Sequence, residues 1–188
     1  MNNLFIISGP SGSGQDSIID GLTKILPIER VVTTTTREPR PGESEGHPYY
    51  FIPKVAFRQS LAAGAFAEHA EQYNGNIYGV TKTELDRVIA SGRVGIWKVE
   101  YQGVKSAKKL FPGIIAIFIA PPSLDILEER LRKRDHPSET YLAERMAYTK
   151  EMLAHTSIYD YSVVNEEGKL DEAVAKTTDI IRKHAHVS

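Results

Sequence analysis

The sequence predicts an α/β fold in which helices cover both faces of a parallel sheet. Short apolar runs alternate with amphipathic segments along most of the 188 residues, as in chains built from successive strand–helix units. A glycine-rich loop, GPSGSG, follows the first apolar run. After the first strand–helix unit, a segment rich in Thr, Pro, Gly and charged residues interrupts the alternation. That segment predicts a small lobe of short strands and turns inserted into the core.

The elements are expected in the following order. The first strand covers residues 3–8, and the helix after the glycine loop buries one face formed by Ile18, Ile19, Leu22, Ile25 and Leu26. The inserted lobe contains a weak helix at residues 54–62. From Thr81 onward we expect strands at 94–100, 114–119 and 161–165, and helices at 82–91, 103–110, 138–155 and 169–184. A further helix is capped by Ser123 and ends in a basic turn before Pro137.

Composition excludes several classes of function. The net charge is −1, so no overall field attracts nucleic acid or membrane. There is no cysteine, which excludes disulfides and thiolate chemistry and would leave only His and carboxylates for zinc. The chain starts without a basic leader region, and no apolar stretch is long enough to span a membrane. We expect a soluble, cytoplasmic protein, whose oligomeric state the sequence does not indicate.

The glycine loop nearly matches a phosphate-binding P-loop, in which Gly, four residues and Gly precede Lys and then Ser or Thr. Here Gln15 replaces the lysine and Asp16 replaces the hydroxyl residue. Backbone N–H groups of such a loop bind phosphate without any side chain, although the loop alone is also compatible with an ordinary strand-to-helix turn. The expected phosphate-binding residues are Gly9, Ser11, Gly12, Ser13, Gly14, Gln15, Asp16 and Ser17.

A second motif, TTTTREPRPGE, spans residues 33–43. Arg37 and Arg40 flank Pro39 in a stiff turn, and two planar guanidinium groups held close together form a clamp for one phosphate. The hydroxyl of Tyr49 follows nearby and donates to the same kind of oxygen. Taken alone, an arginine pair of this kind is usually a solvated loop.

With these motifs, the chain resembles the guanylate kinases, which phosphorylate GMP with ATP. The resemblance covers nearly all of the sequence. It is carried by GPSGSG, TTTTREPRPGE followed by EGHPYYF, FAEHAEQYNGNIYG, VEYQGVKSAKKLFP, FIAPPS and VVN. It implies that the glycine loop binds the phosphates of ATP, and that Arg37, Arg40, Tyr49 and Tyr78, with Thr33 beside them, hold the phosphate of GMP.

The resemblance also implies how the base is recognised. Glu68 matches the acid that accepts hydrogen bonds from guanine N1–H and from the exocyclic amine, whereas adenine presents an acceptor at N1. Glu100 stands near the same base, where the family usually has Asp. Val80 replaces a Ser or Thr that reaches the guanine carbonyl in many members, so that contact is lost unless Thr81 or a backbone N–H supplies it. A missing hydrogen bond would weaken discrimination between bases.

A basic turn supplies the remaining candidates. Arg130 and Arg134 are four residues apart and share a helix face, and Arg145 lies on the next helix. By resemblance these are lid arginines, and phosphoryl transfer needs positive charge around the transferred group. Without the resemblance, the turn would be a solvated helix end that complements the helix dipole. Arg132 and Lys133 are expected to be surface charges.

The family usually has Asp-Ile-Asp where this chain has Lys98-Val99-Glu100. Lys98 and Glu100 point to one side of their strand, whose end should lie beside the P-loop strand. A lysine lost at position 15 therefore reappears at position 98, and an acid lost at 98 reappears at 16. Our hypothesis is that Lys98 contacts the β- and γ-phosphates, that Asp16 binds Mg²⁺ directly or through water, and that Gln15 donates to phosphate. In a competing interpretation Lys98 and Asp16 pair and the protein binds GMP without catalysis.

The sequence therefore predicts a single guanylate-kinase-like domain with a P-loop core (1–32, 81–123 and 154–188), a GMP-binding lobe (33–80) and a helical lid (124–153). The predicted reaction is transfer of the ATP γ-phosphoryl group to GMP with Mg²⁺. One alternative is a GMP-binding or interaction module without catalysis. Another is a kinase for a different phosphorylated acceptor, because a P-loop continuing with Asp-Ser resembles the ribose bisphosphate phosphokinases; TTTTREPRPGE and Glu68 argue against it. A nucleic-acid-binding domain lacks the necessary basic surface run.

Overall fold

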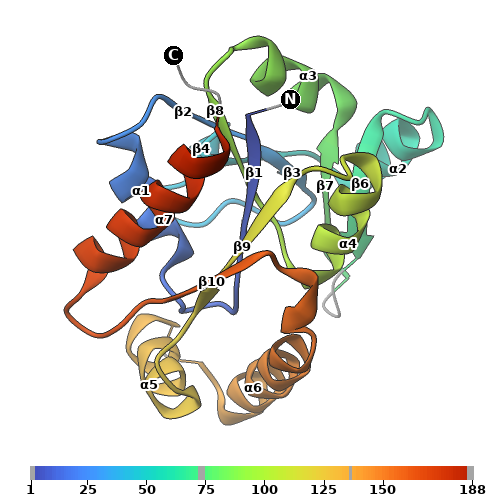
Figure 1. The fold of residues 1–188 in the computed structure, drawn as a ribbon. Coiled ribbons are helices and arrows are strands. Elements are labelled where there is room, and N and C mark those ends of the chain that lie inside the picture. Colours follow the sequence, from blue (N-terminus) through green and yellow to red (C-terminus); the bar gives the residue numbers. More distant parts are fainter. Residues whose placement is uncertain (1–2, 72–74, 136, 186–188) are drawn as a thin grey trace.

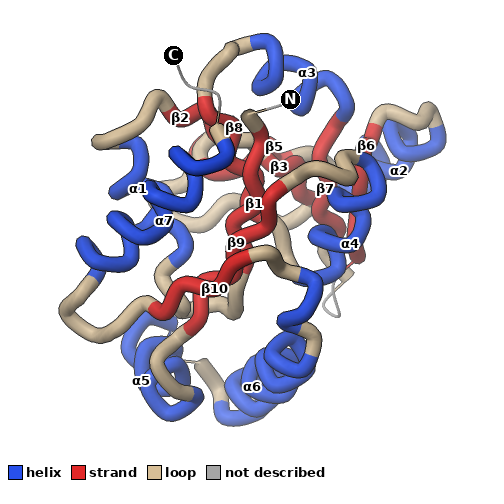
Figure 2. The backbone as a smooth tube through the Cα atoms, in the orientation of Figure 1, coloured by secondary structure: helices blue, strands red, loops and turns tan. Residues whose placement is uncertain are grey.

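Two separate sheets organise the chain (Figures 1 and 2). The computed structural model describes residues 3–71, 75–135 and 137–185. Within them, one sheet has the strand order β10-β9-β1-β8-β2 and the other the order β4-β5-β3-β7-β6. Residues 72–74 of the FAEHAEQYNGNIYG motif, residue 136 of the expected lid and terminal residues 1–2 and 186–188 lie outside the described part.

The first sheet confirms the predicted parallel arrangement, since each of its described strand pairs is parallel. Its strands are β1 (Leu4–Ser8), β2 (Ile28–Arg30), β8 (Val94–Lys98), β9 (Ile115–Ala120) and β10 (Tyr161–Val164). As predicted, the strand that carries Lys98 lies beside the P-loop strand, with Ile7 opposite Lys98. The carboxyl ends of parallel strands meet at one edge, so the glycine loop after β1 and the end of β8 come together there.

Helices cover both faces of this sheet (Figure 1). Phe5 and Ile7 of β1 belong to one apolar cluster, which includes residues of α1 (Gln15–Thr23) and α7 (Leu170–His184). Leu4 and Ile6 belong to the other, which includes residues of α3 (Lys82–Ala90) and α4 (Tyr101–Leu110). Successive side chains of a strand point to opposite faces, and a continuous apolar run is therefore buried on both sides.

The first helix ends earlier than its apolar pattern predicts. Ile18, Ile19 and Leu22 are fully buried, but α1 stops at Thr23 and Ile25 is 47% exposed. The prediction that Ile25 shares the buried face was wrong, because the chain turns at Lys24 and directs this side chain outward. Leu26, one residue further on, returns to the core.

The second sheet is built from the segment expected to form an insertion. It contains β3 (Thr33–Thr35), β4 (Ser44–Glu45), β5 (Pro48–Phe51), β6 (Phe66–Glu71) and β7 (Ile77–Thr81), with α2 (Lys54–Ala62) beside it. Phe57 of α2 stacks on Phe66 with ring centroids 4.2 Å apart and also packs against Ile77. This small cluster gives the inserted segment its own core.

Helices α5 (Leu124–Asp135) and α6 (Glu139–Ala154) lie together beyond the carboxyl ends of the first sheet (Figure 1). The hydroxyl of Ser123 accepts from the amide of Ile126 at 3.2 Å, as a helix cap does. Leu127 and Leu131 pack with Leu142 of α6. The short 3₁₀ helix η1 (Thr156–Ile158) leads back into β10. In the part of the chain that the structure describes, no helix has the length and apolar character needed to cross a membrane.

The junction after β8 differs from the expected boundaries. The strand ends at Lys98, Glu100 is the N-cap residue, and α4 begins at Tyr101 rather than at residue 103. Tyr101 is buried against Phe118, which holds the first turn of the helix in place.

Candidate active site

A cleft of about 1360 Å³ lies where the glycine loop, the second sheet and helices α5 and α6 meet. Nearly all the site residues expected from the sequence line it: Gly9, Ser11, Gly12, Gly14, Gln15, Asp16, Ser17, Thr33, Arg37, Arg40, Tyr49, Glu68, Tyr78, Lys98, Glu100, Arg130, Arg134 and Arg145. Ser13 is the exception, because its side chain is buried beneath the loop. One cleft therefore brings both groups of candidates together.

The glycine loop is held from below by a residue near the other end of the chain. Asn165, which follows β10, donates from its side-chain amide to the carbonyl of Ser13 at 2.8 Å. Gly14 is the N-cap of α1 and has a φ of 91°, and a Cβ placed on it would lie 2.2 Å from the Asn165 amide nitrogen. The first amides of a helix have no acceptor within the helix, so this turn presents a site for an anion. The sequence signal for Asn165 was the VVN motif alone.

The Gln15 side chain is turned into the loop itself. Its amide nitrogen donates to the carbonyl oxygen of Gly9. In this arrangement one amide N–H braces the loop, while the side chain still lines the cleft. The side chain that replaces the P-loop lysine thus donates a hydrogen bond to the loop's own backbone.

Lys98 and Asp16 form an ion pair across the cleft edge. The Lys98 ammonium donates to both carboxylate oxygens, at 2.8 Å and 2.9 Å. Arg30, at the end of β2, donates to the same carboxylate at 2.9 Å. Burial alone would raise the pKa of Asp16, but the charges of Lys98 and Arg30 hold it below its ordinary value. Arg30 was missed by the sequence analysis, since nothing in its local pattern marks it.

The arginine pair expected to clamp a phosphate is organised by a carboxylate. Glu43 accepts two bonds from the Arg37 guanidinium, at 2.9 Å and 2.8 Å, and one from the Arg40 amide at 2.8 Å. Burial favours a raised pKa for Glu43, but these bonds hold its pKa below the ordinary range. Glu43 belongs to the TTTTREPRPGE motif, yet its role as the residue that orients Arg37 was not foreseen.

Aromatic residues of the second sheet complete the clamp. The Arg37 guanidinium carbon lies 5.4 Å from the ring centroid of Tyr49, and Tyr49 meets Tyr78 edge to face with centroids 5.9 Å apart. Thr33 pairs with Tyr49 in the sheet. These residues form one polar wall of the cleft, and their hydroxyl and guanidinium groups are suited to a phosphate group.

The base-recognition candidate Glu68 lies deeper on the same lobe. It stands opposite Val80 in the β6–β7 pair, and burial raises its pKa to about 7. Val80 is fully buried. The hydroxyl of Thr81 accepts from the amide of Glu84 and caps α3. Helix capping uses one lone pair of this hydroxyl, and its O–H can still donate to a carbonyl oxygen.

Glu100 reaches the cleft from the start of α4. It accepts a hydrogen bond from the Tyr148 hydroxyl of α6 at 3.2 Å. Burial and the Glu100 charge together raise the pKa of Tyr148, which therefore remains a donor. This bond connects the residue that replaces the family's Asp to the helical segment beyond the sheet.

The three arginines expected in a lid lie on α5 and α6 and line the cleft. Arg134 donates to the Ser11 hydroxyl at 3.0 Å, and Arg130 donates to the Asn165 carbonyl at 3.2 Å. Arg145 donates to the Tyr141 hydroxyl at 3.0 Å and 2.9 Å. Two of the three thus contact the glycine loop or the residue that supports it.

The neighbouring charges of the basic turn behave differently. Arg132 pairs with Glu128 at 2.9 Å, and Lys133 pairs with Glu129 at 2.7 Å. Their side chains are 44% and 75% exposed. This confirms the prediction that both are surface charges.

Comparisons with known proteins agree with this geometry. The sequence model of the family described as Guanylate kinase matches residues 1–184. The chain is 40% identical over 180 residues to the guanylate kinase of Coxiella burnetii, an alignment that covers 95% of this chain and 86% of that protein. It is 39% identical over 168 residues to the guanylate kinase of Methylococcus capsulatus, covering 89% and 82% of the two chains.

A solved structure supports the fold in the same way. The crystal structure of guanylate kinase from Anaplasma phagocytophilum superposes with a TM-score of 0.75 at 27% sequence identity. The match covers 98% of this chain and 87% of that one. The similarity therefore includes the core, the inserted sheet and the helices beyond it.

Proposed function

The chain belongs to the guanylate kinase family, and we propose from its site how it performs the family reaction, transfer of the γ-phosphoryl group of ATP to GMP. The products are ADP and GDP, and the enzyme is a nucleoside monophosphate kinase. One observation carries the assignment to this cleft. The glycine loop and the Arg37 clamp line the same cavity, so a donor bound at one and an acceptor bound at the other share a common space.

The acceptor is held at two points. Arg37 and Arg40, with Tyr49, Tyr78 and Thr33, bind the phosphate of GMP. Since Glu43 already fixes the Arg37 guanidinium, little side-chain freedom is lost on binding, and the acceptor oxygen is presented in a defined place. Glu68, in its ionised form, accepts from N1–H and from the amine of guanine, and Glu100 lies near the same base.

The donor is held by backbone and by cations. The loop from Gly9 to Ser17 surrounds the ATP phosphates with N–H groups at the start of α1. Lys98 supplies the cation that a P-loop normally places after its last glycine. Its ammonium moves from Asp16 to the β- and γ-phosphates, where positive charge stabilises the transferring group.

Arg130, Arg134 and Arg145 add positive charge from helices α5 and α6. They lie on the segment 124–153, which we propose to act as a lid over the lobe 33–80 and the P-loop core. Closure brings these arginines to the transferred phosphoryl group and excludes water, so that GMP, not water, is the acceptor.

Magnesium is the expected cofactor, and the protein side chains of the site supply few ligands for it. Lys98 and Arg30 both donate to Oδ1 of Asp16, whereas Lys98 alone donates to Oδ2. Oδ2 therefore keeps a lone pair for a metal-bound water. Among the described residues no cluster of three or more His, Asp or Glu side chains could hold a metal. The remaining ligands would be phosphate oxygens and water, and the bound ion would neutralise phosphate charge.

The chain's partners are small molecules. Neither a nucleic acid nor a membrane is needed for this reaction, and GMP and ATP are metabolites of the cytoplasm, where we place the protein. A different phosphorylated acceptor, one without a purine, would leave the half-buried Glu68 without a hydrogen-bond partner from the ligand, which disfavours that alternative.

A coupled assay tests the proposal. ATP, GMP and Mg²⁺ should give ADP and GDP, and AMP in place of GMP should give little turnover. Binding of GMP without formation of GDP, in protein shown to be folded, would instead support the non-catalytic module.

A further inference from the structure

Arg30 joins two acids of the helix that follows the glycine loop. Its guanidinium donates to Asp16 at 2.9 Å and to Asp20 at 3.1 Å. Both acids lie on α1, four residues apart, and therefore face the same way. A planar fork with two donors holds such a pair in one geometry. Arg30 thus fixes the carboxylate with which Lys98 pairs.

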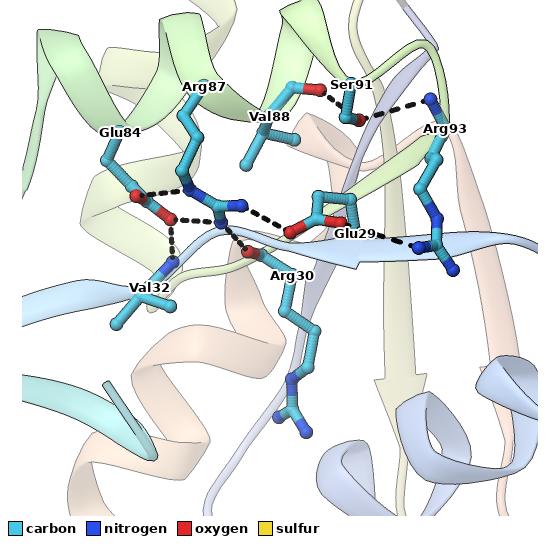
Figure 3. Close-up of polar contacts among 8 residues, drawn as sticks. All are labelled: Glu29, Arg30, Val32, Glu84, Arg87, Val88, Ser91 and Arg93. Atoms are coloured by element: carbon cyan, nitrogen blue, oxygen red, sulfur yellow. Dashed lines mark hydrogen bonds and ion pairs between the residues drawn. The ribbon is translucent and has the colours of Figure 1, made fainter. Parts of the chain in front are cut away.

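The backbone of Arg30 is itself fixed from the other side (Figure 3). Its carbonyl accepts from Arg87 at 3.0 Å, and Arg87 is held by two bonds of 2.9 Å to Glu84 and by a further bond to Glu29. The Arg30 side chain points away from this network (Figure 3). Glu84 also accepts from the amide of Val32 at 2.8 Å. These bonds fix the backbone at the end of β2, from which the Arg30 side chain extends.

Arg30 does not line the main cleft. It lines a second hollow of about 620 Å³, which Lys98 also lines, whereas Asp16 lines the main cleft. Its contact with the phosphate site therefore runs through Asp16. The Asp16 carboxylate is thus the contact through which Arg30 reaches the phosphate site.

The charges explain why Asp16 needs this support. A carboxylate beside the glycine loop repels a bound triphosphate, and the repulsion grows as the local dielectric falls. While Lys98 pairs with Asp16, two cations neutralise that carboxylate. Once Lys98 transfers to the phosphates, as the proposed function requires, Arg30 is the cation that still contacts Asp16 in this structure.

We propose that Arg30 is a positioning residue that neutralises and orients Asp16, so that Lys98 can leave the carboxylate for the nucleotide phosphates. This inference rests on the proposed role of Lys98. Arg30 touches no substrate. Its contribution is to ATP affinity and to the placement of Lys98, and GMP binding does not depend on it.

Calorimetry without added magnesium isolates this effect. Arg30→Ala should weaken ATP binding by about fivefold to tenfold, the scale of one uncompensated charge near a phosphate, with GMP affinity unchanged. Arg30→Lys should restore part of the loss, because it keeps the charge without the fork. Arg93→Ala is the matched control: Arg93 is 53% exposed and its closest contact with Glu29 is 3.9 Å, so ATP affinity should not change.

A double variant makes the test specific. Adding Asp16→Asn to Arg30→Ala removes the charge that needs neutralising, so ATP affinity should recover to near that of the unmutated protein. Melting curves establish that each variant is folded. If Arg30→Ala binds ATP normally, or if the double variant is as weak as Arg30→Ala, the inference is wrong. If the unmutated protein binds no ATP, the proposed function fails first.

Discussion

The ammonium of Lys98 lies 2.8 Å and 2.9 Å from the two carboxylate oxygens of Asp16, although 82 positions separate them in the chain. These are two of the positions at which the sequence departs from its family. By the family resemblance, Asp16 stands where a P-loop has Ser or Thr and follows Gln15 in the place of the lysine, and Lys98 stands where an acid is usual. The spatial contact links the two departures, and the local charge balance is kept while its members exchange places.

Replacing Lys98 with Ala should lower kcat by about two to three orders of magnitude, as loss of a preorganised donor to a developing oxyanion does. GMP affinity should hardly change, because the acceptor clamp lies on the other sheet. Lys108→Ala is a matched control, since Lys108 also pairs with an aspartate at 2.9 Å and is similarly exposed, 29% against 25% for Lys98. Steady-state kinetics of both variants measure the difference, and an unchanged kcat in Lys98→Ala would refute the role of Lys98.

The exchange of positions also predicts a rescue. Lys98→Asp should abolish most activity, and Gln15→Lys added to it should restore much of the loss, a non-additive result expected for residues that share a partner. Gln15→Lys alone should not help, because two cations would then crowd one site and the bond from Gln15 to the Gly9 carbonyl would be lost. The four kcat values form one cycle. Additive losses would mean that the two positions act independently.

GMP binding should depend on pH through Glu68. Burial raises the pKa of this carboxyl to about 7, and only the ionised form accepts both donors of guanine. GMP affinity should therefore be constant above pH 7 and fall about tenfold for each unit below it, in calorimetry. The phosphate of GMP also titrates near pH 6, so Glu68→Gln serves as the control. The variant should bind GMP weakly and show only the phosphate's pH dependence.

The same group predicts the pH dependence of stability. A carboxyl whose pKa is raised in the folded state stabilises the fold fully below its unfolded pKa, near 4.5, and loses that contribution as pH rises through 7. Without GMP, Glu68→Gln should therefore melt at a higher temperature than the unmutated protein at pH 8, and the gap should shrink toward pH 5. A gap that stayed constant across this range would show that Glu68 does not titrate there.

The clamp prediction concerns Glu43. Glu43→Gln removes the charge that fixes Arg37, so GMP should bind several-fold more weakly while ATP binding is unchanged, since charged bonds of this type are about twice as strong as neutral ones. Glu45→Gln in the same lobe is the control, because Glu45 is exposed and accepts from the Phe51 amide rather than from an arginine. Equal GMP affinity in both variants would show that Arg37 needs no support from Glu43.

Much of this architecture could be predicted, and the failures have physical causes. The parallel sheet followed from buried apolar runs alternating with helices, and the glycine loop from its spacing. Arg30 could not be found, because β2 has only three residues and its place beside β8 is a long-range pairing. The direction of Gln15 depends on the nearby Gly9 carbonyl, which residue type alone does not reveal. Ile25 fitted the helical period, but the helix ended before reaching it.

The glycine loop allows a test of how tightly its backbone packs against the Asn165 side chain. Gly14 and Gly42 have similar φ values, 91° and 86°, but they differ in surroundings. A Cβ at Gly14 would lie 2.2 Å from the Asn165 side chain, whereas a Cβ at Gly42 would meet nothing within 4 Å. Gly42→Ala should therefore cost only the left-handed strain, about 1–2 kcal/mol in the free energy of unfolding.

Gly14→Ala should cost distinctly more than this, because it adds a clash that breaks the bond from Asn165 to the Ser13 carbonyl. ATP affinity should fall with it, since that bond supports the loop whose amides we propose to bind phosphate. Denaturant unfolding gives the two free energies, and calorimetry gives the ATP affinities. Adding Asn165→Ala to Gly14→Ala should remove the clash and bring its stability closer to that of Asn165→Ala alone. Equal destabilisation by Gly14→Ala and Gly42→Ala would mean that backbone strain alone lowers the stability. The Asn165 side chain would then move away from the new methyl group without a cost in free energy.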